Sequence, residues 1–278
     1  MSASWTAKSG DAAKTRLVRY FFIILICLAV DIGLHFLWAP TPEYRYPVSS
    51  FVEKGWFLPV VIFLLLLTYI TLAVIFHLIQ SRLPGTRLVK GLTYGVAFGG
   101  LMLVSSPAMS LLFGSQFAAE LRIGLVDGVV IFLLGVSLGQ FTATTSSPRL
   151  RPLFVPAVVS TLVVGLVYFL FHLLIYLIWP SLFPAYLTLP VQTLLWTLGI
   201  GLWIGFMNWL LQDAFATGGP MRQAAGFAAA VGVFSLLNTL FAPVFVDAPT
   251  GILLLNTIVG IFFVGFGGWI ERVARQRH

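Results

Sequence analysis

Eight apolar stretches of about 20 residues recur along this 278-residue chain. A helix needs about that length to cross the roughly 30 Å hydrocarbon core of a bilayer. Charged residues make up only 9% of the chain, against about 25% in an ordinary soluble domain. The sequence therefore predicts an all-α, polytopic integral membrane protein with eight transmembrane helices. The expected spans are 17–38, 57–80, 88–113, 119–141, 153–179, 190–213, 223–246 and 250–271.

Basic residues fall mainly on one side of this layout. If the N-terminus lies inside, Arg45, Lys54 and Arg122 are the only three of the 16 Lys and Arg residues outside, which leaves 13 inside. This positive-inside bias predicts a multi-pass protein of the cell (inner or plasma) membrane with both termini in the cytoplasm. Topology and contact with anionic lipid then account for the net charge of +7. The lipid bilayer is the expected partner and nucleic acid is not.

The two halves of the chain resemble each other in four places that occur in the same order. The matched pairs are WAPTPEY with WPSLFPAY, WFLPVVIF with LTLPVQTLLW, VSSPAMSLLFG with TLFAPVFVDAPTG, and LVDGVVIFLLGVSLGQ with LLNTIVGIFFVGFGGW. This order predicts two four-helix transmembrane repeats, 1–147 and 148–278. An even number of spans per half keeps the two repeats parallel, with a pseudo-twofold axis along the membrane normal.

Glycines at four-residue spacing predict close helix packing inside the bundle, as in Gly91, Gly95 and Gly99 or Gly135 and Gly139. The second stretch, with VVIFLLLL, is expected to face lipid. Each half is also similar to small four-span bacterial membrane proteins of uncharacterised families, whose final span carries an acidic or amide residue followed by glycines. The sequence VDGVVIFLLGVSLG carries this likeness, which implies no activity.

Several polar residues interrupt the apolar stretches at one depth. Asp31 lies seven residues before Trp38, and His172 lies seven before Trp179, which places both about 10 Å below the outer interface. Ionisable groups within a span are costly, so they face one another or a wet cavity. The sequence predicts an outward-facing polar chamber. Its expected lining is Asp31, His35, Asp127, His172, Asn238 and Asn256.

More than one chemistry fits these side chains. A carboxylate and a histidine one turn apart suit a proton relay, because histidine titrates near neutral pH. Two carboxylates and two imidazoles also suit a transition metal, and His35 with His172 would be the pair to hold a haem. In the plainest interpretation they only form hydrogen bonds between helices and fix their register. No metal-site or catalytic sequence motif supports an enzyme, and the sequence assigns no cofactor.

The expected function is therefore a small-solute or ion transporter or channel with an outward-facing polar chamber, which proton coupling would drive. In this hypothesis the two halves rock against each other, and the partner is a small solute or ion. One alternative is a non-catalytic structural or assembly subunit of a larger complex, whose partners would be other membrane subunits. Another is a metal- or haem-binding membrane redox protein.

Overall fold

The computed structural model describes residues 3–39, 43–145, 154–180 and 185–276. In the helices that begin at Ala3 and Phe154, side chains are described from Thr15 and Pro156 on. The described residues contain no named strand, only an isolated β-bridge between Val48 and Val246. The predicted boundary between the halves, 147/148, falls outside the described residues.

Eight helices in the described part are long and apolar enough to cross a membrane, as the sequence predicts. The apolar segments begin and end within a few residues of the expected bounds. They belong to α1 (Ala3–Trp38), α3 (Phe57–Ile79), α4 (Arg87–Ser105), α6 (Phe117–Thr142), α7 (Phe154–Ile178), α9 (Pro190–Leu210), α10 (Pro220–Thr239) and α12 (Thr250–Gln276). Four short α-helices and one 3-10 helix lie between them: α2 (Ser50–Glu53), α5 (Ala108–Phe113), α8 (Ala185–Thr188), η2 (Gln212–Phe215) and α11 (Ala242–Phe245).

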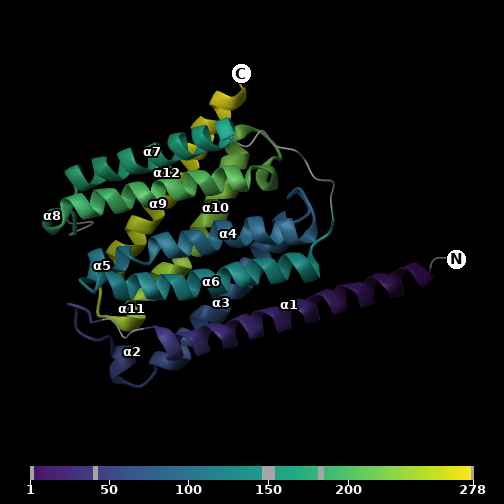
Figure 1. Ribbon diagram of the computed structural model, residues 1–278, viewed down its shortest axis with the longest axis horizontal. Coiled ribbons are helices and arrows are strands. Elements are labelled where there is room, and N and C mark those ends of the chain that lie inside the picture. Colours follow the sequence, from purple (N-terminus) through teal and green to yellow (C-terminus); the bar gives the residue numbers. More distant parts are fainter. Residues whose placement is uncertain (1–2, 40–42, 146–153, 181–184, 277–278) are drawn as a thin grey trace.

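The long helices pack as a closed ring. Following contacts from neighbour to neighbour gives the order α1, α6, α4, α9, α7, α12, α10, α3 and back to α1. In Figure 1 the first five form a row from α1 at one edge to α7 at the other, and α12, α10 and α3 cross behind this row. Helices from different halves of the sequence are neighbours in the ring where α4 meets α9 and where α10 meets α3.

Proline breaks two of the expected spans near one end. The helix α4 ends at Ser105 and α5 begins at Ala108, because Pro107 has no N–H to continue the helical hydrogen bonds. The same interruption separates α10 from α11, which carries Pro243 in its first turn. Each of the two long helices α4 and α10 is therefore followed by a short separate helix, α5 or α11.

Glycines bring α4 and α6 into backbone contact, as their spacing predicts. A Cβ atom added to Gly91 would lie 2.6 Å from the carbonyl oxygen of Gly135, and one added to Gly139 would lie 2.5 Å from the Cα of Gly91. Between α7 and α9, a Cβ at Gly205 would meet the Thr161 carbonyl at 2.5 Å. Helices that are this close gain dispersion energy that bulkier side chains would prevent.

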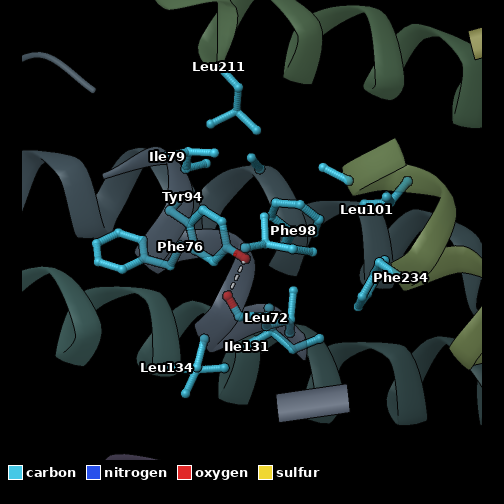
Figure 2. Packing of buried hydrophobic residues seen from close by; sticks show 14 of the residues in the cluster. Leu72, Phe76, Ile79, Tyr94, Phe98, Leu101, Ile131, Leu134, Leu211 and Phe234 are labelled. Carbon is cyan, nitrogen blue, oxygen red and sulfur yellow. Dashed lines mark hydrogen bonds between the residues drawn. The ribbon is translucent and has the colours of Figure 1, made fainter. Parts of the chain in front are cut away.

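The centre of the ring is filled with apolar side chains (Figure 2). The rings of Phe98 on α4 and Phe234 on α10 meet edge to face with centroids 5.5 Å apart. Tyr94 donates a hydrogen bond to the Leu72 carbonyl at 2.7 Å. Leu72 and Phe76 of α3 are fully buried, so the expectation that this stretch only faces lipid was wrong for one face. Apolar residues lie on all sides of this helix, so the sequence does not indicate which face packs inward.

Candidate functional site

Asp31, His35 and Asp127 meet where α1 packs against α6. The Nδ1 atom of His35 lies 3.2 Å from Oδ1 of Asp31, and its Nε2 lies 3.5 Å from Oδ1 of Asp127. The imidazole therefore stands between two carboxylates that belong to different helices. We call Asp31, His35 and Asp127 the triad.

Helical geometry and burial fix the orientation of the triad. Asp31 and His35 are four residues apart, so they share one face of α1, and that face packs on α6. The side chain of Asp31 is fully buried, Asp127 is 12% exposed and His35 is 32% exposed. The carboxylate at one end is thus sealed from the surroundings, while the imidazole keeps a partly open edge.

Tyr69 of α3 forms a hydrogen bond with Asp31. Its hydroxyl donates to Oδ2 of Asp31 at 2.7 Å, and Tyr69 itself is 2% exposed. Nδ1 of His35 lies 3.0 Å from the main-chain carbonyl oxygen of Asp31, which is its hydrogen-bond partner, and this arrangement leaves Nε2 to face Asp127. Oδ1 of Asp31 is buried and has no hydrogen-bond partner among the described residues, although Nδ1 lies 3.2 Å away.

This geometry allows two kinds of chemistry. A doubly protonated imidazole donates toward both carboxylates, whereas a neutral imidazole donates from one nitrogen and accepts at the other. One proton therefore changes the link between α1 and α6. Alternatively, each triad residue offers a ligand atom within 4.8 Å of the others. In that case the imidazole of His35 and the carboxylates of Asp31 and Asp127 would supply the ligand atoms.

His172 does not join the triad, although the sequence predicts that both lie at one depth. It is 2% exposed on α7, and its Nδ1 lies 2.9 Å from the Tyr168 carbonyl oxygen. Aromatic rings surround it, with centroids 4.1 Å away for Tyr168, 5.7 Å for Phe263 and 6.0 Å for Tyr176. The helices that carry His35 and His172 lie at opposite edges of the front row in Figure 1, so these two imidazoles are not placed to hold one haem.

The two asparagines are also placed apart from the triad. The amide of Asn238 on α10 donates to the Phe234 carbonyl at 3.1 Å within its own helix. The Oδ1 atom of Asn256 on α12 is buried and has no hydrogen-bond partner among the described residues. Three of the six expected lining residues therefore meet one another, and three lie elsewhere in the ring.

The sequence reasoning missed Tyr69 and a polar cluster on α7, α9 and α12. Tyr69 sits within LLLLTYITL, where the adjacent threonine and tyrosine were the available signal. In the cluster, the Asn208 amide donates to Ser160 Oγ at 3.0 Å and lies 3.5 Å from Glu271 Oε2. Glu271 also pairs with Arg275, as their four-residue spacing predicts. This cluster and the triad lie in opposite halves of the sequence.

The segment 43–49 covers one end of the ring. The N–H of Arg45 donates to the Phe113 carbonyl at 3.0 Å, and the N–H of Ser49 donates to the Phe245 carbonyl at 3.2 Å. Burial raises the pKa of Tyr44, and the nearby carboxylate of Glu120 raises it further. The two main-chain hydrogen bonds join this segment to α5 and to α11.

No protein family, curated protein or solved structure matches this chain. The geometry of the triad and its surroundings therefore carries the functional argument.

Proposed function

We propose that this protein is a membrane transporter for a small solute or ion, and that the triad binds and releases the coupling proton. The observation that carries the proposal is the position of His35 between Asp31 and Asp127. An imidazole, the side chain that most often gains and loses protons in pH switches, links two helices there, inside otherwise apolar segments. Ionisable groups at such depth commonly mark proton relays and ion pathways.

Insertion in the cell membrane, with both termini in the cytoplasm, is part of this proposal. The eight apolar helices support it by their length and composition. Trp38, Trp56 and Trp179 are all exposed near the ends of their helices, as in the aromatic belts of membrane proteins. The surplus of Lys and Arg on the opposite side gives the orientation.

We further propose that the two halves are parallel four-helix repeats. Exchanging each helix for its expected counterpart maps the ring onto itself: α1 with α7, α6 with α12, α4 with α10 and α9 with α3. Aligning Pro107 with Pro243 also makes Phe98 the counterpart of Phe234, because both pairs are 136 positions apart. These two phenylalanines touch, which is expected of residues beside a pseudo-twofold axis.

The proton would act by changing how α1 is held against α6. With a doubly protonated His35, Nε2 carries a charged donor toward Asp127, and α1 is held to α6. Loss of one proton leaves Asp127 without a donor from His35 if Nδ1 keeps its proton for Asp31. The partly open edge of His35 gives this proton a way in and out. Movement of α1 against α6 is the step that we assign to transport.

Metal binding is a second candidate function, because the three ligand atoms of the triad lie within 4.8 Å of one another. The donor set of one imidazole and two carboxylates suits a divalent transition metal better than Mg²⁺ or Ca²⁺, which prefer oxygen alone. Under this hypothesis the metal ion is the transported solute and competes with the proton for the triad.

The test uses proteoliposomes on a solid-supported membrane, on which transport currents are recorded after solute and pH jumps. The panel contains protons alone, alkali cations, divalent transition metals, and small neutral and anionic solutes. We expect wild-type protein to give a pH-dependent current with at least one of them. Asp127→Asn and His35→Gln should lower that current about 100-fold or more, the usual order for losing a positioned proton-transfer group.

His77→Gln is the matched control, because His77 lies on α3 at the other end of the bundle and contacts Tyr20 instead of the triad. It should leave the current unchanged. Triad variants with wild-type currents would contradict the role of the triad. Silence of the wild-type protein across the whole panel would contradict transport by this chain alone and favour the subunit hypothesis. Metal-dependent currents that protons suppress would favour the second candidate.

A further inference from the structure

A cavity of about 300 Å³ opens where α1, α4 and α6 come together at the end opposite the triad. Three arginines line it: Arg16 and Arg19 on α1 and Arg87 at the start of α4. The other lining residues are Thr15, Phe141, Thr142, Ala143 and Thr144, so the described lining contains no carboxylate. Within the described part of the chain, none of these three arginines forms a salt bridge.

The walls of this cavity are held in place by contacts on each side. Arg19 donates through one guanidinium nitrogen to the Phe141 carbonyl at 3.0 Å, which leaves its other nitrogens available. The N–H and hydroxyl of Thr144 donate to Oε1 of Gln80 at 3.0 and 3.2 Å. Thr86 caps α4 through its side chain just before Arg87. The three arginines therefore line a hollow whose walls are held by these hydrogen bonds.

The chemistry of this hollow matches a phosphoryl anion. Guanidinium groups bind phosphate oxygens through paired hydrogen bonds, and the positive end of the α4 dipole at Arg87 favours negative charge. One apolar side chain that lines the hollow is itself exposed: Phe141 is 56% exposed. A ligand with a phosphate head and acyl tails would contact both surfaces, whereas free phosphate would contact only the first.

We infer that Arg16, Arg19 and Arg87 bind the phosphate headgroup of an anionic phospholipid in the inner leaflet. This inference needs the membrane orientation proposed above but does not depend on the proton site, since the two sites share no residue. The acyl tails of this lipid run along the apolar surface of α1 and α6 beside the hollow. The lipid thereby joins α1, α4 and α6 at the end of the bundle where proton binding does not act.

The first test measures lipid binding to the purified full chain by native mass spectrometry in detergent. Phosphatidylglycerol, phosphatidylcholine and inorganic phosphate are the three probes. We expect phosphatidylglycerol to bind the wild type in preference to phosphatidylcholine. Arg16→Gln with Arg87→Gln should weaken phosphatidylglycerol binding about thirtyfold, from the usual contribution of two basic residues to anionic-lipid attraction. Arg19 is kept because its bond to Phe141 positions the end of α6.

Arg82→Gln with Arg222→Gln is the charge-matched control, because both residues are exposed on the same side and neither lines the hollow. This control should bind phosphatidylglycerol as the wild type does. Arg16→Lys with Arg87→Lys keeps the charge and the fold but loses the paired geometry, so its affinity should fall between the two. Circular dichroism checks that every variant is folded.

Three results would overturn the inference. Equal binding of phosphatidylglycerol and phosphatidylcholine by the wild type would remove the anionic preference. Equal losses in the test and control variants would make the effect one of net charge alone. Binding of inorganic phosphate that phosphatidylglycerol does not displace would assign the hollow to a soluble anion. None of these three results is read from transport currents. Failure of the lipid-binding inference is therefore distinguishable from failure of the proposed proton site.

Discussion

The two halves of the molecule differ in how they hold a polar side chain near a tryptophan at a helix end. Seven residues before Trp38 the first half has Asp31, and seven residues before Trp179 the second half has His172. Asp31 contacts His35 and Tyr69, and through His35 it is linked to Asp127. His172 packs among aromatic rings and has no carboxylate contact among the described residues. Ionisable side chains therefore meet in the first half, whereas the polar side chain in the second half is packed among aromatic rings.

The closeness of the contact between packed helices also differs between the two halves. In the first half, α4 and α6 touch through backbone at several glycines, whereas α10 and α12 in the second half meet at Gly232 through the side chain of Ile261. Backbone atoms of packed helices cannot turn aside, but an isoleucine side chain can change rotamer. The first half therefore tolerates less change at this contact than the second. Paired substitutions in the two halves measure this difference.

The largest expected difference comes from adding one methyl group to each contact. In Gly135→Ala the new Cβ would lie 2.6 Å from the Gly95 Cα, so α4 and α6 must separate. We expect a loss of about 3 kcal/mol or more, at the upper end of overpacking effects. Gly232→Ala meets the Ile261 side chain at 2.9 Å and should cost about 1 kcal/mol.

Reversible unfolding of both glycine variants in mixed micelles, followed by circular dichroism, measures these costs. Gly33→Ala is the control, since a Cβ there meets nothing within 4 Å. Equal losses for Gly135→Ala and Gly232→Ala would contradict the proposed difference in rigidity.

A smaller difference should separate two tyrosines that bind polar partners on neighbouring helices. Tyr69→Phe removes the hydrogen bond to Asp31 and should cost about 2 kcal/mol, as for bonds to charged groups. Tyr176→Phe removes a bond between two hydroxyls, at Thr197, and should cost about 1 kcal/mol. The same unfolding assay decides the order. A larger cost at Tyr176 would mean that Asp31 contributes no charge to its hydrogen bond.

The smallest expected effect lies where the two halves meet. The indole N–H of Trp203 on α9 donates to the Ala97 carbonyl of α4 at 3.1 Å. Trp203→Phe should therefore cost about 1 kcal/mol. Trp196 lies on the same helix, but its indole nitrogen is buried without a partner among the described residues. Trp196→Phe should be neutral within about 0.5 kcal/mol, or slightly stabilising. Chemical unfolding of both variants against wild type tests whether this hydrogen bond helps hold the halves together.

The parts of the fold that depend on local sequence were predictable. Apolar length gives each long helix, because hydrocarbon thickness sets the number of residues. The spacing of Glu271 and Arg275 gives their pairing, and the spacing of Gly91 and Gly139 with their neighbours gives close packing. Each of these rests on the geometry of one helix. Helix geometry also places Asp31 and His35 together.

Which helices become neighbours could not be read in the same way. The sequence placed Asp31, Asp127 and His172 at one depth, but depth does not determine the order around a ring. Lipid is as apolar as leucine, so hydropathy does not say which face of α3 turns inward. Tyr69 was missed for that reason, although its contact with Asp31 depends on that choice of face. The position of His172 away from the triad follows from the ring order in the same way.

The ring order has a consequence for biosynthesis. When the ribosome has made only the first four spans, α4 still lacks α9 and α3 still lacks α10, because both partners come from later sequence. One flank of each helix must therefore wait in lipid or against an insertion factor until the second set emerges. The two halves therefore complete each other's packing only after both have been synthesised. A chain that stops after the fourth span leaves helix faces unpacked, which makes it a substrate for quality control.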